Sequence, residues 1–301
     1  MPKKVTIVEV SLRDGLQNES VDLSIEERAD LARRLAKAGI TRLELGAFVR
    51  TDRIPQMKGT RELVQKIMPE WDQKMRPSVL VPNERGMVDA LATSIKEIAL
   101  FMACSETFSQ KNINCSIEES FERSLSVIKM AKKHKIKIRG YLSTCFGCPY
   151  EGKVKEEKVV TLAQRLLSLG CFEVSIGDTI GVATPLQIES VFTKLKKKVP
   201  VHRLAGHFHD TRGTAVANVA AAVRLGVRVF DSSLGGLGGC PYAPGAAGNV
   251  ATEDLVYMLH GMKIKTGLDL DALVDASRYL SRLIKKPLPS RLAQAGPWET
   301  V

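Results

Sequence analysis

Short strand-like runs alternate with longer amphipathic segments along almost the whole chain. Runs of this kind predict strands. The expected strands cover 5–10, 41–45, 77–81, 98–102, 137–143, 172–176, 204–209 and 227–232. The longer segments between them predict helices. The expected helices cover 24–38, 61–68, 84–93, 117–134, 155–169, 185–198, 214–225 and 252–259.

Individual residues mark several of the expected helix boundaries. Ser24, with Glu27 three residues later, is typical of a capping box at a helix start. Gly39, Gly170 and Gly226 end three of the helices. Strands and helices that alternate at this spacing predict a parallel sheet. Eight such units within about 260 residues favour closure into a (β/α)8 TIM barrel over an open doubly wound sheet.

The 301 residues contain no Pro/Gly/Ser linker and no low-complexity stretch. We therefore expect one catalytic barrel domain over 1–301. The barrel itself covers about 5–262, and a C-terminal helical extension covers about 267–295, with its helix at 269–285. Hydrophobic residues at 44% and charged residues at 26% are ordinary for a globular protein and allow an adequate core.

The start of the chain and its cysteines indicate the compartment. Residues 1–4 lead straight into the first expected strand, without the apolar region of a secretory signal. No apolar run approaches the ~20 residues that a membrane-spanning helix needs. Six cysteines are spread along the chain without the density of a disulfide scaffold. We therefore expect a protein of the reducing cytoplasm, with no membrane partner.

The formal net charge of +11 admits functional and structural explanations. A basic protein attracts polyanions such as nucleic acid, or acidic ligands such as coenzyme A. The Lys and Arg residues are scattered, and aromatic residues make up only 5% of the chain. A base-stacking nucleic-acid surface is therefore disfavoured. A basic solvated surface is the simpler explanation, and we expect no nucleic-acid partner.

The sharpest chemical feature is the pair His207 and His209 at the end of the seventh expected strand. The active site of a (β/α)8 barrel lies at this end of its strands. Residues i and i+2 of a strand point the same way, so both imidazoles can face one ion. With Asp14 nearby, the nitrogen and oxygen donors suit Mg²⁺, Mn²⁺, Zn²⁺ or Co²⁺. The alternative is a pair of hydrogen-bonded histidines at the barrel rim.

Three further charged residues lie at or near the ends of expected strands, at the same end of the barrel. Arg13 could stabilise a developing oxyanion, and the alternative is a salt bridge between Arg13 and Asp14. Glu44 and Asp178 are carboxylates at or near strand ends. Pairing with Arg13 is the structural alternative for each of them, and capping of the next helix is another for Asp178.

A glycine-rich segment at 235–239 follows the eighth expected strand and leads to Cys240. It lacks the Lys-Ser/Thr ending of a P-loop, and its glycines predict a loop that closes over a ligand. Cys240 could transfer a proton there, or could be an incidental thiol. Cys145 and Cys148 form a CxxC without a second pair, so we expect active-site loop or packing roles rather than a zinc site.

Longer stretches of the chain resemble the 3-hydroxy-3-methylglutaryl-CoA lyase family, from the first strand to about residue 295. The stretches that carry the resemblance are 13–19 (RDGLQNE), 55–57 (PQM), 111–121 (KNINCSIEESF), 139–141 (RGY), 147–152 (GCPYEG), 177–181 (GDTIG), 236–242 (GLGGCPY), 248–249 (GN) and 251–258 (ATEDLVYM). The Arg-Asp-Gly and His-x-His pieces are shared with isopropylmalate and homocitrate synthases. The glycine loop that ends in Cys-Pro-Tyr is more specific to the lyases.

The resemblance implies a reaction, a cofactor and a set of partners. The reaction is metal-dependent cleavage of 3-hydroxy-3-methylglutaryl-CoA to acetyl-CoA and acetoacetate, as in leucine degradation and ketone body formation. The cofactor is a divalent cation, Mg²⁺ or Mn²⁺. The implied partners are the acyl-CoA substrate and a second copy of the chain in a homodimer.

The resemblance also implies roles for individual residues. The cation ligands would be Asp14, His207, His209 and Asn249. Arg13 would stabilise the enolate of the departing acetyl-CoA. The other implied site residues are Glu44 and Asp178 as supports, Cys240 in proton transfer, Tyr141 at the substrate, and Asn112 on its coenzyme A side.

Several positions depart from the family pattern. Ala47 stands where a Ser is usual, 50–52 (RTD) replaces Ser-Pro-Lys, Arg212 replaces Tyr, and Gly235 replaces Ala. None is a presumed catalytic residue, and the changes at 47–52 bear on the acyl group accepted. The alternatives are a lyase for a related 3-hydroxyacyl-CoA, an acetyl-CoA-condensing synthase of the same barrel group, and a non-catalytic barrel that binds coenzyme A.

Overall fold

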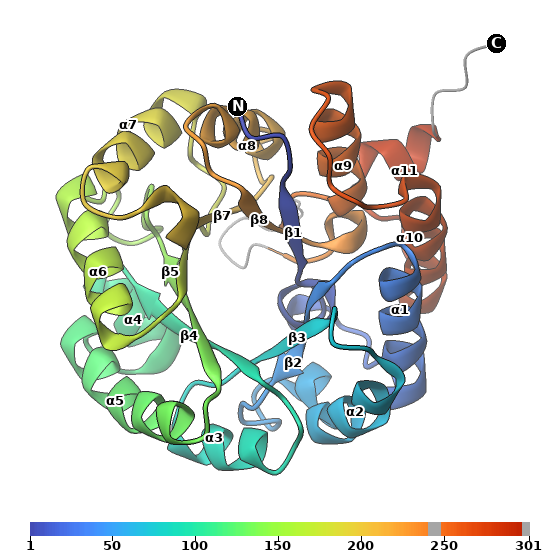
Figure 1. The fold of residues 1–301 in the computed structure, drawn as a ribbon, viewed down its shortest axis with the longest axis horizontal. Coiled ribbons are helices and arrows are strands. Elements are labelled where there is room, and N and C mark those ends of the chain that lie inside the picture. Colours follow the sequence, from blue (N-terminus) through green and yellow to red (C-terminus); the bar gives the residue numbers. More distant parts are fainter. Residues whose placement is uncertain (240–247, 297–301) are drawn as a thin grey trace.

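The computed structural model describes residues 1–239 and 248–296. Eight parallel strands close into a barrel in the order β1 to β8, with β8 paired to β1. From β1 to β8 the strands are Thr6–Glu9, Arg42–Ala47, Arg76–Leu80, Glu97–Ala103, Lys137–Ser143, Glu173–Asp178, Leu204–Phe208 and Val229–Ser232. Figure 1 shows this ring of strands with helices around it. The predicted (β/α)8 barrel is therefore confirmed.

The helices cover the outside of the barrel, close to the predicted ranges. They are α1 Ile25–Lys37, α2 Thr60–Ile67, α3 Glu84–Leu91, α5 Ile117–Lys133, α6 Glu156–Leu169, α7 Pro185–Lys196, α8 Ala215–Arg224, α9 Thr252–Gly261 and α10 Leu270–Ile284. The capping box of Ser24 and Glu27 is present. Gly39 and Gly170 adopt left-handed φ angles of 94° and 114°, which end their helices. α10 packs beside α1 (Figure 1).

Several short elements were not predicted. α4, Glu106–Ile113, is capped by the Ser105 side chain and ends at Asn114 in the left-handed conformation. α11, Arg291–Ala295, lies against α9. A π-helical turn, Ser11–Gly15, directly follows β1. Short 3-10 turns cover Leu16–Asn18, Pro55–Met57, Met68–Glu70, Val201–Arg203 and Leu234–Gly236. These pieces are too short to produce a clear apolar period in the sequence.

The apolar core lies between the barrel and the helices, and the outward-facing side chains of the strands form its inner layer. Leu43, Val79 and Ile98 of the strands are fully buried, as are Leu35 of α1 and Leu63 of α2. Truncating a side chain of this kind to alanine costs about 2–5 kcal/mol. This layer therefore holds the strands in register. No helix in the described ranges is both long and apolar enough to cross a membrane.

The barrel interior holds a chain of buried, oppositely charged side chains. Nη2 of Arg42 lies 3.3 Å from Oε1 of Glu97 and 3.0 Å from Oε1 of Glu173. Nε of Arg139 donates to Oε1 of Glu173 over 2.7 Å, and its Nη2 lies 2.7 Å from Oδ1 of Asp231. Branched apolar residues usually fill such an interior. These five side chains therefore form a connected network that leads toward the barrel mouth. The pairing is needed because an unpaired charge is costly to bury.

Candidate active site

The π-helical turn after β1 places Arg13 and Asp14 at the barrel mouth. The N–H groups of Arg13 and Gly15 both donate to the Val10 carbonyl over 3.1 Å. The resulting wide turn buries both charged side chains, which are 6% and 8% exposed. π-turns occur frequently at functional sites. The local backbone thus presents a cation and an anion side by side, and the two form an ion pair.

Arg13 is held on its other side by Glu44 of β2. Nε of Arg13 donates to Oε2 of Glu44 over 2.6 Å, and the Tyr141 hydroxyl donates to the same oxygen over 3.2 Å. Burial alone would lower the pKa of Arg13, but Glu44 and Asp14 raise it, so the guanidinium is charged. Burial raises the pKa of Glu44, and Arg13 opposes that rise. The predicted alternative of a Glu44–Arg13 pair is therefore present, and it fixes the guanidinium in place.

Asp14, His207 and His209 converge on one point, as the sequence predicted. Their ligand atoms all lie within 4.8 Å of one another, and all three residues are buried. The Nε2 atoms of the two histidines face each other at 3.2 Å, and each lies 3.8 Å from Oδ2 of Asp14. Phe208, between the histidines, points the other way and packs edge-on against Phe192.

This donor set fits a divalent cation. Two imidazole nitrogens and a carboxylate oxygen are ligands that Mn²⁺, Zn²⁺ and related ions accept. Burial alone would raise the pKa of Asp14, but Arg13 and the two histidines hold it well below its usual range. Asp14 is therefore a carboxylate at neutral pH. The two Nε2 atoms face each other, and a lone pair on such a nitrogen can bind a cation placed between the rings.

Two amide side chains surround Asp14. Nδ2 of Asn249 donates to Oδ2 of Asp14 over 2.8 Å and to the Leu237 carbonyl over 3.3 Å. Gln17, which the sequence did not single out, donates to Oδ1 of Asp14 over 3.1 Å. Asn249 thus lies beside the converging residues. As a ligand it would bind through its amide oxygen, and that role stays a prediction.

Asp178 lies at the end of β6 and anchors the loop that follows it. Its two carboxylate oxygens accept the backbone N–H groups of Val182 and Ala183, each over 3.0 Å. Burial raises the pKa of Asp178, and these hydrogen bonds lower it. Thr184 is the N-cap of α7, so Asp178 holds the loop before this helix and does not cap the helix, as the predicted alternative had it. A catalytic role for Asp178 stays a prediction.

The remaining predicted residues lie in different surroundings. Tyr141 is buried, and Arg13 lies over its ring at 5.2 Å. Asn112 is exposed near the end of α4. Cys240 lies outside the described residues, so its expected role at the loop tip is untested. Cys145 and Cys148 are buried, and Sγ of Cys148 accepts the Tyr150 N–H over 3.3 Å, which is a packing and turn role.

The described start of the glycine loop passes close over Asn249. Gly235 and Gly238 have φ angles of 65° and 132°, in the left-handed region that favours glycine. A Cβ on Gly238 would lie 2.9 Å from Nδ2 of Asn249. Glycine is therefore required at Gly238 by both its backbone conformation and this close approach.

Two buried carboxylates tie down the start of this loop. Oε1 of Glu9 accepts the Leu234 N–H over 2.9 Å, and Oε2 of Glu253 accepts the Gly235 N–H over 2.8 Å. Burial raises the pKa of Glu253 to about 7. The sequence did not predict these contacts, because the two acids lie 244 positions apart along the chain (253 − 9).

Glu253→Gln should flatten the dependence of stability on pH. The folded pKa of about 7 lies above the ordinary 4.5, so the stabilising contribution of Glu253 is complete below pH 4.5 and is lost as pH rises to about 7. Glutamine does not titrate. The unfolding free energy of the variant relative to the parent should therefore rise by up to about 3 kcal/mol between pH 4.5 and 8. Urea unfolding at several pH values measures this. Glu122→Gln, on the exposed face of α5, is the matched control, and equal pH trends in both variants would contradict the prediction.

Asp231 and Arg139 are site residues that the sequence analysis did not single out. Nδ1 of His207 lies 3.2 Å from Oδ2 of Asp231, and Arg139 contacts the other oxygen of that carboxylate. Both are fully buried on barrel strands. The sequence signal that could have identified them is a charged residue within an expected strand, Asp231 in β8 and Arg139 in β5. The alternation of side chains along β8 and β5 directs both into the barrel.

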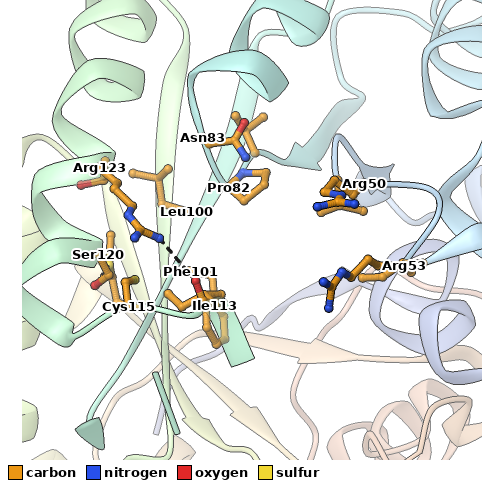
Figure 2. Close-up of a pocket in the computed structure, with 15 residues that line it drawn as sticks. Arg50, Arg53, Pro82, Asn83, Leu100, Phe101, Ile113, Cys115, Ser120 and Arg123 are labelled. Carbon is orange, nitrogen blue, oxygen red and sulfur yellow. Dashed lines mark hydrogen bonds between the residues drawn. The ribbon is translucent and has the colours of Figure 1, made fainter. Parts of the chain in front are cut away.

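A separate cavity of about 270 Å³ lies between the loop after β2 and the start of α5. Figure 2 shows Arg50 and Arg53 on one side of it and Arg123 on the other, with Leu100 and Phe101 of β4 between them. Phe101 pairs in register with Tyr141, which contacts Glu44. The cavity therefore lies at the same end of the barrel as the site, although no site residue described above lines it. Arg50 belongs to the segment that departs from the family pattern.

The fold and the converging donors define a (β/α)8 barrel with a candidate divalent-metal site. The HMGL-like family model matches residues 4–280, and the chain belongs to this family. The chain is 46% identical over 299 residues to a 3-hydroxy-3-isohexenylglutaryl-CoA/hydroxy-methylglutaryl-CoA lyase of Pseudomonas aeruginosa, covering 98% of both chains.

Solved structures agree with this assignment. A hydroxymethylglutaryl-CoA lyase from Pseudomonas aeruginosa superposes with a TM-score of 0.96 at 46% identity, covering 98% of each chain. An HMG-CoA lyase from Acinetobacter baumannii, in complex with coenzyme A and 3-methylmalate, superposes with a TM-score of 0.93 at 36% identity. That alignment covers 99% of this chain and 98% of the other.

Proposed function

We propose that the protein is a carbon–carbon lyase that cleaves 3-hydroxy-3-methylglutaryl-CoA to acetyl-CoA and acetoacetate. The observation that carries the proposal is the buried guanidinium of Arg13 next to the cation-binding set of Asp14, His207 and His209. A site of this kind can hold an oxygen-rich substrate and stabilise a developing negative charge. Membership in the HMGL-like family supports the same reaction.

The proposed cofactor is Mg²⁺ or Mn²⁺, held by Asp14, His207 and His209 with Asn249 as a further ligand. Such a cation, when bound, lowers the pKa of a substrate hydroxyl and orients a neighbouring carboxylate. The contribution of the chain is to hold two imidazoles and an ionised Asp14 in one buried place. Arg13 keeps Asp14 ionised, as its lowered pKa indicates.

Arg13 acts on the charge that the reaction creates. A base takes the proton of the tertiary hydroxyl, and the C3–O bond becomes the ketone of acetoacetate. The bond between C2 and C3 breaks, and its electron pair moves onto the thioester to give an enolate. A fixed cation near that oxygen stabilises it in the transition state. Arginine suits this role because it stays charged when buried. Glu44 and Tyr141 position the guanidinium from the side away from Asp14.

The enolate must then be protonated at carbon to give acetyl-CoA. We assign this step to Cys240, because the resemblance places it on the glycine loop that starts beside Asn249. A closed loop would keep bulk water away from the enolate. Asp178 supports the loop before α7, and Asn112 lies on the coenzyme A side. We further propose a homodimer in the cytoplasm.

A direct assay tests the proposed activity. The protein is incubated with 3-hydroxy-3-methylglutaryl-CoA and Mg²⁺ or Mn²⁺, and acetoacetate and acetyl-CoA are each quantified. We expect the two products in equal amounts. Formation of neither product would overturn the assignment. Condensation of acetyl-CoA with a 2-oxo acid would replace it with the synthase alternative.

A second candidate substrate is a 3-hydroxyglutaryl-CoA with a longer branch at C3. One relative carries both 3-hydroxy-3-isohexenylglutaryl-CoA and the methyl compound in its name. The cavity of about 270 Å³ at the same end of the barrel, with its largely apolar walls, is the observation that favours it here. An isohexenyl chain is an apolar group that such walls would accept.

Val49→Phe tests this second candidate. Val49 lines the cavity and is only partly buried, so a larger side chain should narrow the cavity without disturbing the core. We expect kcat/KM for the isohexenyl substrate to fall by about 10-fold or more. A mismatch of one methylene group in an apolar pocket has an effect of this size. The kcat/KM for the methyl substrate should be retained. Equal loss for both substrates, or no isohexenyl activity in the parent, would exclude this use of the cavity.

A further inference from the structure

Asp231 of β8 contacts the candidate metal ligand His207 on the ring nitrogen that faces away from Asp14 and His209. Its Oδ2 lies 3.2 Å from Nδ1 of His207 and accepts the Ser175 hydroxyl over 2.7 Å. A carboxylate can only accept hydrogen bonds, so Nδ1 of His207 must carry the proton in this contact. The other ring nitrogen, Nε2, is then left with its lone pair. It is Nε2 that faces His209 and Asp14.

Charged side chains inside the barrel fix the position of Asp231. Oδ1 of Asp231 lies 2.7 Å from Nη2 of Arg139, whose Nε donates to Oε1 of Glu173. Glu173 is held in turn by Arg42 over 3.0 Å. These side chains are all buried inside the barrel. The carboxylate therefore stays charged and has little freedom to turn away from His207.

His209 offers an internal comparison. Its Nδ1 is buried and has no hydrogen-bond partner among the described residues. An outside carboxylate therefore sets the proton position of His207, whereas His209 has only the 3.2 Å contact with Nε2 of His207, to which its own Nε2–H donates when no metal is bound. The two histidines of the pair are unequal, although the sequence presents them as equivalent.

We infer that Asp231 is a positioning residue that locks His207 in the tautomer with its proton on Nδ1, so that Nε2 is ready to bind a cation. Arg139 and Ser175 hold Asp231 in the orientation that does this. Outer-sphere carboxylates of this kind orient metal-binding histidines and increase their basicity. The inference rests on the metal site of the proposed function, but the tautomer itself exists before any metal binds.

The tautomer can be measured in the metal-free protein. The chain has only five histidines, so ¹⁵N-histidine labelling gives a small spectrum, and His207→Gln identifies the signals of His207. In alkaline buffer we expect the coupling pattern of a ring that carries its proton on Nδ1 and none on Nε2. A ring protonated on Nε2 would overturn the inference. This result does not depend on lyase activity, so it separates failure of the inference from failure of the proposed reaction.

Metal affinity supplies the second arm of the test. Asp231→Asn keeps the size of the side chain but removes its charge, and we expect the Kd for Mn²⁺ to rise by about 10- to 100-fold. Ser175→Ala removes one neutral hydrogen bond to the same carboxylate and should change that Kd by less than about fivefold. Parent-like Mn²⁺ affinity in Asp231→Asn would contradict the inference. If this variant fails to fold, the tautomer of the parent protein decides the question.

Discussion

Arg13→Gln should lower the turnover of 3-hydroxy-3-methylglutaryl-CoA by about 10³-fold, at the upper end for loss of a group that stabilises a developing oxyanion. Glutamine is polar, but it is shorter than arginine and carries no charge. Asp14, His207 and His209 remain in place, and the bound cation itself can replace Arg13 as the charge partner of Asp14, so Mn²⁺ should still bind. Steady-state kinetics and Mn²⁺ titration of the same sample measure both quantities. Near-normal turnover would remove Arg13 from the proposed role.

Two controls keep this prediction specific. Arg13→Gln leaves the buried carboxylate of Glu44 without its partner, which could disturb the fold. The double variant Arg13→Gln, Glu44→Gln removes that uncompensated charge, and turnover should stay low while thermal stability recovers. Arg33→Gln removes a cation from an exposed pair with Glu70 on the outside of the barrel. It should leave turnover unchanged.

His209→Ala should have the second large effect, on metal binding first and on turnover as a consequence. It removes one of three converging donors, so the loss of Mn²⁺ affinity should exceed the about 10- to 100-fold expected for loss of an outer-sphere partner. Turnover at low Mn²⁺ should collapse, and a large excess of Mn²⁺ should restore part of it. Isothermal titration and kinetics against Mn²⁺ concentration measure the two effects.

His202→Ala is the matched control, because His202 is an exposed histidine in the turn before β7. It should bind Mn²⁺ and turn over substrate as the parent does. If His209→Ala retained the parent affinity for Mn²⁺, the facing histidines would be a hydrogen-bonded pair, which is the alternative that the sequence left open.

The fold could be predicted from the sequence because its signals are local and repeated. Each of the eight strands and the longer helices carries its own apolar pattern, and Ser24 with Glu27 marks a helix start that the structure contains. The His207 and His209 pair could be predicted for the same reason, since strand geometry alone places both on one face. Asp14 required the barrel topology, which brings the end of β1 to the end of β7.

The rest of the site depends on contacts between distant parts of the chain. Asp231 meets His207 only because β8 and β7 are neighbours in the barrel. Glu9 and Glu253 reach the same loop from opposite ends of the sequence. The π-helical turn at Ser11–Gly15 has no apolar period to reveal it. Spacing in the sequence cannot report such contacts, whereas the closed barrel creates them.

The central claim is that Asp14, His207 and His209 hold a divalent cation that the lyase reaction needs. The most direct measurement is a titration of the chelator-treated protein with Mn²⁺, in which bound Mn²⁺ and acetoacetate formation are followed together. We expect negligible acetoacetate without metal, and activity that rises in proportion to bound Mn²⁺ and saturates at one ion per chain. Full activity after complete removal of metal would contradict the account.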